Sequence, residues 1–105
     1  MKFINLTQHE INEATTGLVV QPTRPAVRLD MATTTIEVID GIPIVRSEFI
    51  GTLTNLPEPQ EGVMYIISAL ALNGVPDNRT DVVAPGDAVR DRLGKVVACR
   101  GFRRK

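Results

Sequence analysis

Short apolar runs recur along the chain, and turn-forming residues separate them. The runs are rich in Val, Ile, Leu and Thr, while Gly, Pro, Asn or Asp stand between them. Short runs with this composition and these boundaries are typical of β-strands. The pattern predicts strand segments over residues 2–6, 10–12, 18–20, 26–29, 33–39, 42–45, 63–67, 82–83, 88–90 and 96–99.

Two hairpins are expected. Asp40-Gly41 stands between two of the apolar runs, and this dipeptide is favoured in two-residue hairpin turns because both residues tolerate a positive φ. Pro43 has no N–H to donate, so the return strand should have a free edge. Residues 91–94, which end in a glycine, predict a second hairpin near the end of the chain. Pro85-Gly86 is interpreted as a turn between two brief strands.

Residues 63–67 form the most apolar run, and we expect them to be a central strand buried on both faces. Residues 68–74 have the composition of a short helix that Ser68 can cap and Gly74 can close. The sequence therefore predicts a mostly β fold: a small single-domain β-barrel or sandwich of short strands and hairpins, with one short helix near 68–74. Residues 1–105 are expected to form one domain.

Composition and charge narrow the possible partners. Twelve basic and twelve acidic side chains cancel, which argues against a general nucleic-acid binder. No leader-like segment or apolar run near twenty residues is visible, so no membrane association is expected and the cytoplasm is the predicted location. The last three residues, 103–105, are interpreted as a solvated basic tail.

The sequence carries no catalytic signature. One histidine and one cysteine cannot complete a zinc site or a disulfide, and the glycines are isolated in turns instead of forming a phosphate-binding loop. Cys99 is expected to be a buried, inert thiol. No enzyme activity, metal or cofactor is therefore predicted.

Arginine is the notable polar residue, since nine of the twelve basic side chains are Arg. Arg is favoured where a planar group must recognise carboxylate or phosphate. Two interpretations stay open: structural ion pairs with nearby aspartates, or convergence of several arginines on an anionic ligand. For the second, Tyr65 offers a ring for stacking, and Ser68 and His9 offer hydrogen bonds. The candidate ligand-binding residues are His9, Arg28, Tyr65, Ser68, Arg79, Asp81, Arg90, Asp91 and Arg100.

Three segments carry a family resemblance: KFINLTQHEI at the start, GTLTNLPEPQEGVMYIISALA in the middle and RTDVVAPGDAVRDRLGKVVACRGF near the end. They resemble a group of small phage and prophage proteins, also present in actinobacterial chromosomes, whose pattern is NLTPH, then Leu-Pro-x-Pro before a Tyr-Ile-Val-Ser strand, then RxDVxxP leading to VRDxxG. Gln8 replaces the proline of the first motif. The resemblance implies a viral accessory protein and brings no established activity.

Small phage proteins without enzyme motifs commonly act by stoichiometric binding, so the predicted function is anti-defence. The chain would bind and sequester a small anionic nucleotide-derived signal in the host cytoplasm, as a homo-oligomer and without catalysis. One alternative is a stoichiometric protein inhibitor of a host defence complex that lends an edge strand to its target. A more distant alternative is a hydrolase that degrades the signal.

Overall fold

The computed structural model describes residues 1–105, apart from the side chain of Phe49. The chain is mostly β, as predicted, with one short helix. The elements are β1 (Lys2–Asn5), β2 (Ile11–Glu13), β3 (Leu18–Val20), β4 (Arg28–Ile39), β5 (Ile42–Thr54), β6 (Val63–Ile66), α1 (Ala69–Leu72), β7 (Val82–Arg90) and β8 (Val96–Arg103).

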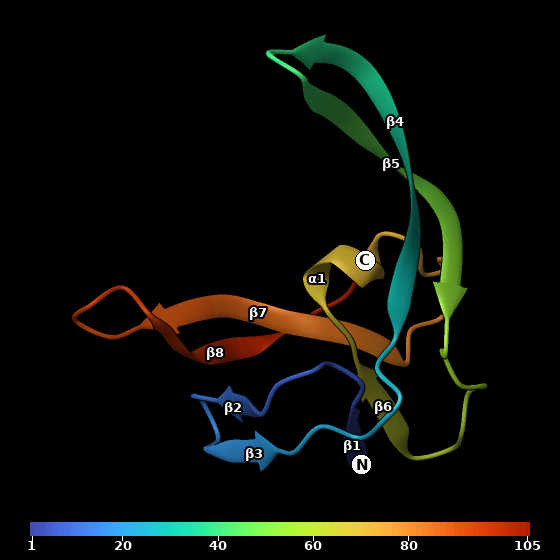
Figure 1. The fold of residues 1–105 in the computed structure, drawn as a ribbon. Coiled ribbons are helices and arrows are strands. Elements are labelled where there is room, and N and C mark those ends of the chain that lie inside the picture. The colour runs from blue at the N-terminus through green and yellow to red at the C-terminus, as the bar shows by residue number, and fades with distance from the viewer.

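Six strands form a nearly closed, barrel-like sheet in the order β1-β6-β7-β8-β2-β3, which we call the body (Figure 1). The β1–β6, β6–β7 and β2–β8 pairs are parallel, and the β7–β8 and β2–β3 pairs are antiparallel. A bridge between Asn5 and Pro22 brings the two outer strands together, and the Thr23 N–H donates to the Asn5 carbonyl at 2.7 Å. Because three of the pairs are parallel, several strands lie beside strands that are distant in the sequence.

The body has apolar side chains on two sides of β6. Ile66 faces the interior with Ile11, Val83 and Cys99, and partly buried side chains such as Phe3 pack against them. Its neighbours in the chain face the other way, toward the helix: this second cluster is Leu6, Val27, Tyr65, Ile67, Ala71, Leu72, Val75, Val82 and Ala84. The expectation that residues 63–67 are central and buried on both faces is confirmed, since Tyr65, Ile66 and Ile67 are almost completely buried.

The helix and the first hairpin also form where the sequence places them. Ser68 caps α1, because its hydroxyl accepts a hydrogen bond from the Ala71 N–H at 3.1 Å. Asp40 and Gly41 both have positive φ, 52° and 79°, as a two-residue hairpin turn between antiparallel strands requires.

The expected turn at Pro85-Gly86 is wrong. Both residues lie inside β7, in the part of that strand that pairs with β8, from Ala84 to Arg90. The reason is a close approach of two backbones: a Cβ atom on residue 86 would collide with the carbonyl oxygen of Arg100. Glycine inside a strand often marks such an approach, so here it is a packing requirement and not a turn signal.

The β4–β5 hairpin, which we call the arm, extends away from the body (Figure 1). Leu29 and Leu53 at its base pack against the core cluster around the helix, but every side chain from Met31 to Glu48 is exposed. The radius of gyration is 16.3 Å, against about 13 Å for a compact domain of this length. Among the side chains the structure describes on the arm, eight large apolar ones are exposed: Met31, Ile36, Val38, Ile39, Ile42, Ile44, Val45 and Ile50.

Candidate functional site

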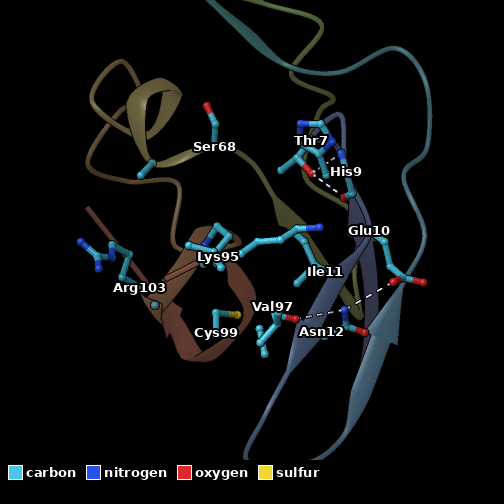
Figure 2. A pocket seen from close by; sticks show the side chains of 15 residues that line it. Thr7, His9, Glu10, Ile11, Asn12, Ser68, Lys95, Val97, Cys99 and Arg103 are labelled. Atoms are coloured by element: carbon cyan, nitrogen blue, oxygen red, sulfur yellow. Dashed lines mark hydrogen bonds between the residues drawn. The ribbon is translucent and has the colours of Figure 1, made fainter. Parts of the chain in front are cut away.

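A groove of about 790 Å³ lies between β2, β8 and the start of α1 (Figure 2). Small-molecule sites commonly enclose a few hundred to about a thousand cubic ångströms, so the groove can hold a ligand of nucleotide size. Its lining residues are Thr7, His9, Glu10, Ile11, Asn12, Ser68, Ala69, Pro85, Gly86, Lys95, Val96, Val97, Ala98, Cys99 and Arg103.

The floor of the groove is apolar. Ile11 and Cys99 are buried there, and Val97 exposes 45% of its surface beside them. Burial raises the pKa of the Cys99 thiol above its ordinary value of 9.0, and the charge on Glu13 adds to the effect. The thiol therefore stays protonated at neutral pH, where it packs as a small apolar group and is a poor nucleophile.

Positively charged side chains stand at the rim of the groove. Lys95 precedes β8 and Arg103 ends it, so this one strand brings both cations to the groove. Neither side chain takes part in the hydrogen bonds and ion pairs found among the described residues. Glu10 is the one carboxylate in the lining, and it accepts hydrogen bonds from Gln21 and Asn12. Lys95 and Arg103 outnumber it, so the charge of the groove favours an anionic ligand.

The loop that carries His9 to the groove is shaped by Asn5, which is fully buried. The Asn5 Nδ2 donates to the carbonyls of His9, at 2.7 Å, and Val20, at 3.0 Å. Its Oδ1 accepts from the Thr7 N–H at 2.9 Å and from the Thr7 hydroxyl at 2.6 Å. This amide thus uses its full hydrogen-bonding capacity. The Asn-Leu-Thr element of the first motif therefore fixes the corner at which the body closes.

Glu13 forms a second buried polar corner, at the end of β2. Its carboxylate accepts from the backbone and the hydroxyl groups of Thr15 and Thr16, and from the Gly101 N–H of β8 at 2.8 Å. These donors hold the pKa of the Glu13 carboxyl well below its ordinary value of 4.5. The ionised Glu13 side chain thus links β2 to β8, the strand that ends at Arg103.

Of the nine predicted ligand-binding residues, the groove contains His9 and Ser68. Figure 2 shows them on different elements: His9 is on the loop after β1, and Ser68 is at the start of the helix. The Ser68 hydroxyl already caps the helix. The helix has only one turn, so it offers little dipole to an anion.

Three other predicted residues gather below the helix. Arg79 pairs with Asp81 at 2.9 Å and donates to the Pro57 carbonyl at 2.8 Å. This hydrogen-bonded pairing raises the pKa of Arg79 and lowers that of Asp81. Tyr65 is 1% exposed and donates its hydroxyl to the Glu58 carbonyl at 3.0 Å, so its ring is not open for stacking. For Arg79 and Asp81 the structural ion pair, one of the two interpretations of the sequence, is what the structure contains.

The remaining predicted residues lie apart from the groove. Arg90 donates to the Gly94 carbonyl at 2.8 Å, and Asp91 accepts from two N–H groups of the same turn. Arg28 is exposed at the base of the arm. Arg100 lines a second, polar hollow of about 520 Å³ with Gly86, Asp87, Phe102, Arg103 and Arg104. The predicted arginines therefore do not converge in one pocket.

The basic end of the chain, residues 103–105, is exposed to solvent, as expected, but it also contacts the body. The Arg104 Nε donates to the Thr80 carbonyl at 2.9 Å. Lys105 donates to the Val75 carbonyl at 2.9 Å and lies 3.4 Å from the Asp77 carboxylate. These contacts fix the end of β8, including Arg103 at the groove.

Sequence reasoning missed Lys95 and Arg103 as groove residues, because neither belongs to a motif. It also missed Asn5, although Asn is favoured in turns because its side chain can bond the backbone two residues further on.

Within the described residues, no group of three or more His, Cys, Asp or Glu side chains is arranged to hold a metal ion. Among the described residues, no helix is long and apolar enough to cross a membrane. Comparison with protein-family models, with curated proteins and with solved structures finds no match to this chain.

Proposed function

We propose that the chain binds a small anionic, nucleotide-like molecule in the groove and sequesters it without chemical change. The observation that carries this proposal is the combination of an apolar floor with two cationic side chains that one strand, β8, supplies.

The two parts of the groove suit the two parts of a nucleotide. A base is flat and largely apolar on its faces, so it can lie on the floor of the groove and remove the exposed surface of Val97 from water. Phosphate oxygens accept charge-assisted hydrogen bonds, which Lys95 and Arg103 can donate. His9 and Ser68 stand at the same groove and can contact the sugar. The proposal keeps the function predicted from the sequence but assigns the phosphate contacts to Lys95 and Arg103 instead of the predicted arginines.

The biological role we propose is anti-defence. A viral accessory protein that holds a nucleotide-derived signal in the host cytoplasm would lower its free concentration. This role needs no catalytic group, only an affinity that matches the concentration of the signal.

The test is titration calorimetry and thermal unfolding with cyclic dinucleotides, cyclic oligonucleotides and ADP-ribose, with inorganic phosphate as the simplest anion. A bound ligand should raise the unfolding temperature, and above its dissociation constant the increase should grow with the logarithm of its concentration. Lys95→Ala and Arg103→Ala should each weaken binding about 10-fold or more, as expected for loss of a hydrogen bond to a charged group. Lys2→Ala and Arg24→Ala remove matched cations outside the groove and should bind as the natural chain does.

The same experiment separates the alternatives. If the folded protein responds to none of these ligands, the proposal fails and the inhibitor of a host protein takes its place. If a bound ligand is consumed, as chromatography of the mixture would show, the chain is a hydrolase.

A further inference from the structure

The arm has the properties of an interaction surface. It leaves the body at Leu29 and Leu53, and beyond this base its described side chains have no core to pack against. A two-stranded hairpin alone is only marginally stable in water. An arm of this length therefore needs a cover that this copy of the chain does not supply.

Both faces of the arm are apolar near its tip. Ile39 pairs with Ile42, and the next pair, Val38 with Pro43, points to the opposite face because side chains alternate along a strand. Val38 and Ile42 expose 61% and 63% of their surfaces. An arm with one apolar face could lie flat on a partner, but an arm with two such faces must be enclosed.

The exposed area matches what a stable interface uses. At roughly 100 Å² for each half-exposed side chain, the arm's eight apolar residues offer about 800 Å². A standard specific interface buries about 800 Å² on each partner. Two arms that each cover a partner would therefore bury an area typical of permanent homodimers.

Charge indicates which surface fits. Residues 28–54 contain two arginines and four carboxylates, a net charge of −2, so the rest of this neutral chain carries +2. Two arms brought together would repel, whereas an arm and the body of another copy are complementary. We infer that the arm of one copy docks on the body of a second copy, so that two chains exchange arms.

Sedimentation equilibrium of the purified chain over roughly 1–200 µM tests this inference, in the concentration range of moderate affinities. We expect a species of twice the chain mass of 11.5 kDa. Val38→Thr combined with Ile42→Thr keeps the branched shape of both side chains but makes the tip polar, and should raise the dissociation constant about 30-fold or more. Thr34→Ser, at an exposed position of the same arm where the side chain is already polar, is the matched control and should not change it.

Circular dichroism would establish that each variant is folded. A natural chain that remains a monomer over the whole range, or a folded tip variant that associates as well as the natural chain, would overturn the inference.

A photo-crosslinking residue in place of Ile42 gives a second readout that does not depend on a destabilising substitution. Mixed heavy- and light-isotope chains should yield cross-links from the tip of one chain to the body of another. Cross-links from tip to tip would overturn arm exchange. So would a pure monomer whose arm cross-links instead to a different protein in a host lysate.

Discussion

The body and the arm are built from the same kinds of apolar residue, but the body buries these side chains and the arm exposes them. Ile66 and Ile67 of the body are completely buried, while Ile42 of the arm exposes 63% of its surface. In both regions the β-branched side chains favour an extended backbone. Apolar content thus determines that a segment is a strand, whereas burial depends on which other strands cover it.

The two regions are also held together by different means. The arm depends on the local Asp40-Gly41 turn and the pairing of adjacent strands. The body depends on residues far apart in the chain, such as Glu13, whose carboxylate binds the Gly101 N–H. Comparable substitutions should therefore change the free energy of unfolding by different amounts in the body and in the arm.

The largest difference is expected for the same substitution in each region. Ile66→Ala leaves a cavity between all the packed strands of the interior and should lower the free energy of unfolding by about 2–5 kcal/mol. Ile42→Ala should change it by less than about 0.5 kcal/mol. Chemical denaturation at a concentration low enough to keep the chain monomeric measures both. Equal losses would show that the arm has a core of its own.

Asn5→Ala should have the next largest effect. It removes four hydrogen bonds of a fully buried side chain, to the Val20 and His9 carbonyls and from the Thr7 N–H and hydroxyl, and we expect a loss of about 2–3 kcal/mol. Asn12→Ala is the control, because the Asn12 amide makes only long contacts of 3.4 and 3.5 Å and its loss should cost less than about 0.5 kcal/mol. If both variants unfold at the same denaturant concentration, the closing corner is not held by Asn5.

Two glycines sharpen the comparison further. Gly86→Ala places a Cβ against the Arg100 and Gly101 carbonyls, so β7 and β8 must separate at a cost of about 2 kcal/mol. Gly51→Ala in the arm meets no atom within 4 Å and only pays for its φ of 78°, about 1 kcal/mol. Thermal unfolding of the two variants measures the order, and a more damaging Gly51→Ala would contradict this account.

Lowering the pH should reduce the stability of the body, because the body contains the Glu13 carboxylate. The pKa of Glu13 is lowered in the folded chain, so the unfolded chain binds the proton first as the pH falls. The stability that this carboxylate contributes is complete above about pH 4.5 and is lost progressively below it. Glu13→Gln should be less stable at pH 7 and should flatten part of this acid dependence.

Denaturation midpoints between pH 7 and about pH 2, a range that spans the ordinary carboxyl pKa values, test this. Glu61→Gln, at an exposed position outside the strands, is the control. An unchanged acid slope in Glu13→Gln would exclude Glu13 as its source.

The fold could be predicted where the signal is local. The Asp40-Gly41 turn and the Ser68 cap act within a few residues, so the sequence alone identifies them. The parallel pairs could not be predicted, because nothing near Lys2 indicates that it lies beside Val63. Gly86 shows the same limit, since its partner backbone comes from a strand later in the chain.

The site was less predictable than the fold. An arginine near an aspartate in the sequence can pair with it or point to a ligand, and Arg79 with Asp81 does the first. Lys95 and Arg103 reach the groove only because β8 runs along it, which is a property of the sheet order. The turn at residues 5–7 was more accessible to prediction, because the Asn5 side chain bonds Thr7 within the same short loop.

The strand order also has a consequence for how the chain folds during synthesis. β1 cannot pair until β6 has been made, because Lys2 lies beside Val63. β2 can pair early with β3, but its second neighbour, β8, comes at the end of the chain, where Cys99 lies beside Glu13. The arm needs only its own two neighbouring strands and can form before the body closes. On the ribosome, an apolar hairpin would thus be presented before the body exists, and the nascent chain would depend on rapid completion or on chaperones to avoid aggregation.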